Sequence, residues 1–132
     1  HGNLNRLPSK VPMDATVVYL DGNNLDVLHA HLFIGRHSIQ KLFLNSSNIR
    51  TLQNRTFHGL RALQVLHLQD NMIVHLNGFE FSGLRHLKEL YLQNNRLSFL
   101  SNTTFSGLRN LEVLHIQNNF VVDFPIWVLR SN

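Results

Sequence analysis

Apolar residues alternate with other residues in short runs that recur along the whole chain. In one run Leu66 and Leu68 flank His67, and this period of two predicts a short β-strand with both leucines on one face. The run returns every 24 residues, so two columns of core positions are expected. The first column is Val18, Leu42, Leu66, Leu90 and Leu114, and the second is Leu20, Leu44, Leu68, Leu92 and Ile116.

Each run begins a longer unit that is repeated without insertion or deletion. The unit has the pattern LxxLxLxxNxLxxL, followed by a phenylalanine, a Gly-Leu pair and the next leucine. Self-similarity at a fixed period of this size is typical of solenoids. We therefore expect an α/β solenoid segment of about five 24-residue repeats over 16–125. Short parallel strands should line its concave side, and irregular or 3-10 segments its convex side.

An asparagine stands where each strand gives way to a turn. Its amide can donate to and accept from turn backbone groups that would otherwise be buried unpaired. We expect a structural asparagine ladder, in which Ser47 replaces one amide and makes the second turn the least firmly held. The ladder positions are Asn23, Asn71, Asn95 and Asn119.

The concave side is predicted to carry a column of rings beside a column of amides. Large, rigid rings with polar flanks favour protein recognition. Stacked rings that only stabilise the sheet are an equally good interpretation, and a pH-dependent interface at His67 and His115 is a further one. The ring column is Tyr19, Phe43, His67, Tyr91 and His115. The neighbouring column is Asp21, Asn45, Gln69, Gln93 and Gln117.

Charge adds little to this picture. The 132 residues hold 12 Lys and Arg against 8 Asp and Glu, a formal charge of +4. One basic column, at His37, Arg61, Arg85 and Arg109, is expected to be a solvated flank, with a phosphate or glycan contact as the less favoured alternative. Because these cations do not share a stripe with the rings, nucleic-acid binding is not expected. We also expect no metal site, cofactor or catalysis, since no ligand set or catalytic constellation stands out among the residues.

Three N-x-Ser/Thr triplets could accept N-linked glycans: Asn45, Asn54 and Asn102. Asn54 and Asn102 occupy the same place in their units, on the predicted outward flank. Asn45 lies in the concave amide column, where a glycan would restrict access to Phe43 and Lys41. An unmodified polar residue is the even alternative there.

These residues resemble an extracellular leucine-rich repeat horseshoe of the 24-residue type. More specifically, the chain resembles the long Toll receptors of arthropods, related to 18-wheeler and Tollo. The resemblance rests on VPMDATVVYLDGNNL (11–25), FIGR (33–36), LFLNSSNI (42–49), NRTFHGL (54–60), LQVLHLQDN (63–71), LKELYLQNN (87–95) and FPIWVL (124–129). It implies the last repeat block before the membrane, between two cysteine-rich caps.

The chain contains no cysteine, and this departs from the pattern of the resembled receptors. The resemblance implies that 1–15 is the tail end of an N-terminal cap and 126–132 the lead-in to a C-terminal one, with the cap cysteines outside both ends. Repeat arrays need covered ends. We therefore expect an excerpt whose ends are covered by something else, and a membrane connection only through a downstream span.

The resemblance implies a non-enzymatic ectodomain on the extracellular side of the cell membrane. Its partners would be a secreted, cystine-knot Spätzle-like cytokine or another receptor, with dimerisation possible in principle. A matrix or adhesion protein in which the repeats are a structural spacer is the alternative. Intracellular scaffolding would fit the absence of cysteine but would leave the glycosylation triplets unexplained.

Overall fold

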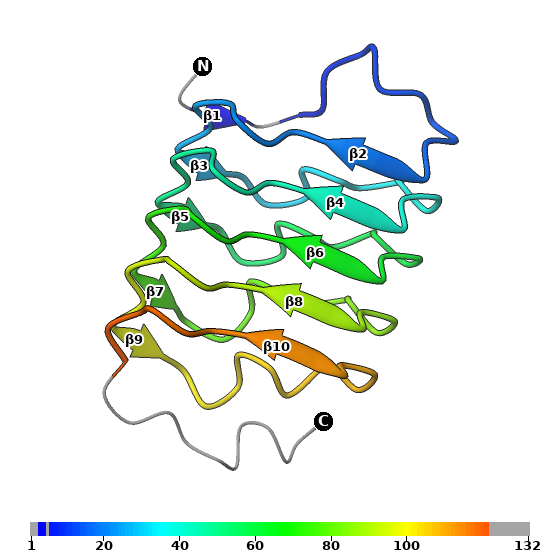
Figure 1. Ribbon diagram of the computed structural model, residues 1–132. Coiled ribbons are helices and arrows are strands. Elements are labelled where there is room, and N and C mark those ends of the chain that lie inside the picture. The colour runs from blue at the N-terminus through cyan, green and yellow to red at the C-terminus, as the bar shows by residue number, and fades with distance from the viewer. Residues whose placement is uncertain (1–2, 5, 122–132) are drawn as a thin grey trace.

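The computed structural model describes residues 3–4 and 6–121, and it shows parallel strands stacked into a solenoid (Figure 1). Five three-residue strands form one sheet, in the order β10-β8-β6-β4-β2. They are β2 (Val17–Tyr19), β4 (Lys41–Phe43), β6 (Val65–His67), β8 (Glu89–Tyr91) and β10 (Val113–His115). Five two-residue strands lie along another edge of the stack: β1 (Asn3–Leu4), β3 (Val27–Leu28), β5 (Thr51–Leu52), β7 (His75–Leu76) and β9 (Phe99–Leu100).

The register of every strand pair is 24 residues. Leu66 of β6 pairs with Leu42 of β4 on one side and with Leu90 of β8 on the other. The same register extends further toward the N-terminus than the sequence pattern indicated, because Asn3 and Leu4 of β1 pair with Val27 and Leu28 of β3. Residues 3–4 therefore lie one repeat ahead of β3, within the stretch expected to belong to a cap.

The core consists of the repeated apolar columns. Leu42, Leu66 and Leu90 are fully buried. Behind the strands, four phenylalanine rings stack in turn, with centroids 5.9, 6.0 and 6.2 Å apart: Phe33, Phe57, Phe81 and Phe105. The rings on the strand face are only 4.4–5.0 Å apart. Because the same repeats are closer together on the strand face than behind it, the sheet of long strands is the concave side.

The asparagines at the strand ends bind both their own turn and the neighbouring one. The Asn71 amide nitrogen donates to the carbonyls of Leu44 (3.0 Å) and Leu68 (2.9 Å). Its oxygen accepts from the backbone N–H groups of Ser47 and Ile49. Ser47 makes fewer bonds, with its hydroxyl donating to the Leu20 carbonyl at 3.3 Å and the Asn45 carbonyl at 3.0 Å.

The residue before each ladder position adopts a left-handed backbone conformation. Values of φ are 54° at Ser46, 60° at Asp70, 58° at Asn94 and 59° at Asn118. Asn and Asp tolerate this conformation better than most residues. Their side chains add a second, exposed ladder, in which Asn94 donates to Asp70 and Asn118 donates to Asn94, both at 2.9 Å.

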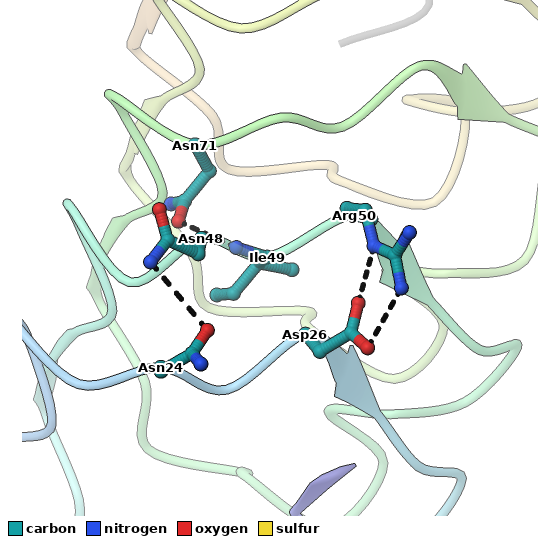
Figure 2. Close-up of polar contacts among 6 residues, drawn as sticks. All are labelled: Asn24, Asp26, Asn48, Ile49, Arg50 and Asn71. Carbon is teal, nitrogen blue, oxygen red and sulfur yellow. Dashed lines mark hydrogen bonds and ion pairs between the residues drawn. The ribbon is translucent and has the colours of Figure 1, made fainter. Parts of the chain in front are cut away.

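Further contacts between repeats follow the ladder (Figure 2). Asn48 donates to Asn24 at 3.5 Å, and the Arg50 guanidinium makes two bonds to Asp26, one of them 2.8 Å long. The hydrogen bond from Arg50 lowers the pKa of Asp26, with a smaller Coulomb contribution, against the opposing effect of desolvation.

The edge of short strands is interrupted in the third repeat. Sheets β1-β3-β5 and β7-β9 are separate. In the neighbouring repeats Gln53 and Ser101 donate their N–H groups to Leu28 and Leu76 one repeat away. At the equivalent place, the Asn77 N–H donates to the carboxylate of Glu80 (2.7 Å), as does Gly78 (3.0 Å). Glu80 is 1% exposed and thus replaces a bond between repeats with a bond inside one.

The two ends of the described array differ. At the N-terminal end Leu7 is buried against the core, and Val11 and Ala15 pack on it. Arg36 holds this segment by donating to the carbonyls of Val11 and Pro12. At the other end every β10 residue is only partly buried. The expected lead-in at 126–132, with Phe124 and Trp127, lies outside the described residues.

The predicted solenoid of 24-residue repeats with short parallel concave strands is confirmed. Within 3–4 and 6–121, the convex segments are turns, bends and irregular chain, with no α- or 3-10 helix. Among the same residues, no helix has the length and apolar character needed to cross a membrane.

Substitution Asn95→Ala should destabilise the array by about 2–4 kcal/mol, because it leaves buried backbone groups unpaired. Asn95 is 5% exposed, donates to the Leu68 and Leu92 carbonyls and accepts from the Ile73 N–H. Urea unfolding followed by circular dichroism measures the change. Asn24→Ala is the control, since Asn24 is exposed and has one long side-chain bond. Equal losses in the two variants would contradict a structural role for Asn95.

Candidate protein-recognition face

The concave sheet brings five rings into one continuous stack. Strand pairing aligns them in register, one from each long strand. From Tyr19 to Phe43, His67, Tyr91 and His115, successive ring centroids are 4.6, 4.5, 4.4 and 5.0 Å apart, with interplanar angles of 13° or less. We call these five side chains the ring stack.

Exposure varies along the ring stack. Tyr19 is 68% exposed at its N-terminal end, while the four other rings are half-buried. Each stacked pair contributes about 0.5–1.5 kcal/mol beyond its burial. The stack therefore stabilises the sheet and at the same time presents a strip of ring edges on the concave surface. The two interpretations offered by the sequence are compatible in this geometry.

The amide column lies beside the ring stack. His67 Nδ1 is 3.3 Å from Gln69 Oε1. Within the described part of the chain, Asn45 Oδ1 and Gln93 Oε1 are buried without a hydrogen-bond partner. Rotation of either side chain would present its amide to a donor on a bound partner. Gln117, at the C-terminal end of the column, is exposed.

The column on the other side of the ring stack contains two charges, Lys41 and Glu89. Tyr91 donates its hydroxyl to Glu89 Oε1 at 2.6 Å. That hydrogen bond raises the pKa of Tyr91, with smaller contributions from desolvation and from the negative charge of Glu89. The phenol is therefore held as a neutral donor and its orientation is determined by Glu89.

His67 lies in the centre of the ring stack, and its environment favours the neutral imidazole. Burial between Phe43 and Tyr91 is the largest effect and lowers the pKa of His67. The hydrogen bond with Gln69 and the charge of Glu89 oppose this shift, and Lys41 adds to it.

The three triplet asparagines differ in accessibility. Asn54 and Asn102 are exposed, whereas Asn45 is half-buried. The threonines that complete the first two triplets are buried, and they bond to the neighbouring repeat: Thr56 donates to the Leu28 carbonyl at 3.0 Å and Thr104 to the Leu76 carbonyl at 3.3 Å. These threonines therefore have a structural use that the sequence pattern did not reveal.

The basic column lies away from the ring stack. His37, Arg61, Arg85 and Arg109 are exposed on the segments that return behind the sheet. Sequence reasoning missed the cavities beside this column and the outward Phe79 in one of them. The signal for Phe79 was present, because it stands where the flanking repeats have Arg55 and Thr103. In the described part of the chain, no group of three metal-ligating residues comes together.

His67 should make folding less favourable in mild acid. Folding lowers its pKa, so its contribution is fully present above the pKa of an unfolded imidazole, about 6.5. The contribution is lost as pH falls through the lowered pKa of the folded state. Thermal unfolding of His67→Phe between about pH 5 and about pH 7.5 should show a flatter pH dependence than the parent. His86→Gln is the control, because it removes an exposed imidazole outside the ring stack. An unchanged slope in His67→Phe would refute the assignment.

Comparison with known proteins agrees with this geometry. A leucine rich repeat family model matches residues 15–73 and 61–120. Toll-like receptor 7 of Drosophila melanogaster is 61% identical over 36 residues, which are 27% of this chain and 2% of that protein.

Three solved structures are also similar. The TLR13 complex with ssRNA13 has a TM-score of 0.80 at 30% identity, over 84% of this chain and 16% of that one. The leucine-rich repeat domain of APL1B scores 0.80 at 26% identity, over 88% and 35%. The Drosophila Toll–Spatzle complex scores 0.75 at 27% identity, over 84% and 15%.

The chain thus spans far less than two thirds of each of these relatives, and the similarity to Toll receptors concerns a segment of their ectodomains. The family model, in contrast, covers most of the described repeats, and the columns of the structure coincide with it. The fold is one of non-enzymatic protein-interaction modules. The chain belongs to the leucine-rich repeat family.

Proposed function

We propose that this chain is part of a Toll-type receptor ectodomain and that its concave face binds a protein partner. The observation that carries the proposal is the unbroken ring stack along all five long strands. Ring edges present large contact areas at low cost in conformational entropy. The half-buried amides of Asn45, Gln69 and Gln93 beside them supply hydrogen bonding, which is the usual composition of a recognition surface.

The partner we favour is a secreted, cystine-knot cytokine of the Spätzle type. The support is the similarity to Toll-like receptor 7 and to the Toll structure solved with Spatzle. A second receptor is the other candidate partner. The site would consist of the ring stack together with Gln69, Gln93 and Gln117.

An extracellular location and N-linked glycans are part of the same proposal. Asn54 and Asn102 are exposed and are the favoured glycan sites, whereas Asn45 is half-buried, with its Oδ1 covered. Glycans at the two exposed positions would leave the concave face open. If the repeats serve only as a matrix spacer, the ring stack would stabilise the sheet and bind nothing.

The double substitution His67→Ala and Tyr91→Ala should weaken binding of a purified Spätzle-like cytokine by at least about tenfold, because it removes two central rings of the contact surface. Binding is measured by surface plasmon resonance on the full secreted protein that contains these repeats. Phe79→Ala is the matched control, since it removes an exposed ring from the convex side.

Circular dichroism and thermal unfolding check that both variants remain folded. Loss of affinity in the folded double variant, with the control unchanged, supports the concave site. If the double variant binds as well as the parent, the recognition surface lies elsewhere or the repeats act as a spacer.

A further inference from the structure

The positive charge of the chain is concentrated on the convex side. The four convex segments 29–40, 53–64, 77–88 and 101–112 contain six Lys or Arg residues and two Glu residues, a net +4. This equals the formal charge of the whole chain, so the remaining residues are balanced. Ionic attraction to the protein should therefore be directed to this side.

One of the two convex carboxylates is hidden. Glu80 is 1% exposed and accepts hydrogen bonds from the backbone N–H groups of Asn77 and Gly78. The other, Glu112, directly precedes β10 at the edge of the concave sheet. The convex surface between them presents cations without neighbouring carboxylates to neutralise them.

Two adjoining cavities give this surface its shape. One, of about 770 Å³, includes Arg55 and Arg109, and the other, of about 460 Å³, includes Arg61 and His86. They share His58, Gly83 and Arg85, and no Asp or Glu lines either of them. We call the combined feature the basic groove and define it by its exposed cations and imidazoles: Arg55, His58, Arg61, Arg85, His86 and Arg109.

The groove also has an apolar wall. Phe79 is 56% exposed and lines the larger cavity, in the repeat where Glu80 interrupts the short-strand edge. Its neighbour Gly78 (φ 129°) passes close to Thr103, so that an added Cβ would lie 2.3 Å from Thr103 Oγ1. The glycine therefore allows the chain to take the path that presents Phe79 outward.

We propose that the basic groove binds a linear sulfated polysaccharide. Arg61, Arg85 and Arg109 repeat once per turn of the solenoid, which suits a ligand that repeats its anionic groups. Phe79 gives a sugar ring an apolar surface for its C–H face. The site lies on the opposite side from the proposed protein-binding face and is independent of it.

A polysaccharide fits this groove better than a nucleic acid does. Proteins that bind single strands combine a cationic groove with successive aromatic platforms for the bases. Here the successive rings lie on the concave face. Of the aromatic side chains that line the two cavities, Phe79 is exposed and Phe81 is 3% exposed.

The favoured glycan positions are compatible with an open groove. Asn54 and Asn102 belong to the repeats on either side of the third one, which has Gly78 in that column. Glycans would therefore flank the central repeat. The binding experiment is performed on secreted protein before and after enzymatic removal of its N-glycans.

The test is binding to a size-defined heparin oligosaccharide by surface plasmon resonance. The triple variant Arg61→Ser, Arg85→Ser, Arg109→Ser should lose at least about tenfold in affinity, because three ionic contacts are removed. The matched control Lys10→Ser, Lys41→Ser, Arg96→Ser removes the same charge from exposed positions outside the groove and should keep most of the affinity. Phe79→Ala should also weaken binding, with no change in net charge.

Specific results would overturn the proposal. These are equal losses in the two triple variants, no binding by the folded parent protein with or without its glycans, or stronger binding of single-stranded RNA or a poly-glutamate peptide than of the oligosaccharide. The double variant His67→Ala, Tyr91→Ala should bind the oligosaccharide like the parent. Failure of the concave-face proposal is thereby distinguished from failure of this one.

Discussion

The strict stacking register of 24 residues is the constraint on which the rest of the structure depends. Each repeat buries its strand leucines, such as Leu66 and Leu68, only against the equivalent residues of its neighbours, so a shift of one residue would turn the whole column outward. Because the register is exact, residues 24 apart along the chain become neighbours in space. A column of rings, amides or cations on the surface is a direct consequence of the core that holds it.

Polar groups maintain this register where the apolar core cannot. At the strand ends the backbone turns and would bury unpaired N–H and C=O groups, and asparagines such as Asn71 and Asn95 satisfy them in two repeats at once. The unequal ring spacing, closer on the strand face than along the phenylalanine stack behind it, shows how the stack curves. Curvature brings the concave rings into van der Waals contact and separates the convex side chains, leaving room for the cavities there.

Much of this was predictable from the sequence because the period is so regular. The strands, the leucine columns, the parallel pairing and the alignment of Tyr19 with His115 through three intervening rings all follow from counting in steps of 24. The left-handed turns at Asp70 and Asn94 could not be read from the apolar pattern, because backbone conformation and not burial selects these residues. Pairing of residues 3–4 was missed because two residues make too short a pattern to recognise.

The third repeat shows how a local departure from the pattern acquires a consequence. Glu80 stands in the column where Thr56 and Thr104 donate to the neighbouring repeat, and a carboxylate has no proton to donate at neutral pH. It turns inward, accepts from the backbone of its own turn, and the strand edge separates between β5 and β7. The same inward turn removes a negative charge from a surface otherwise rich in arginine. One substitution thus weakens a contact between repeats and leaves the basic groove uniformly cationic, so the irregular repeat is the place where this side of the solenoid differs most from a spacer.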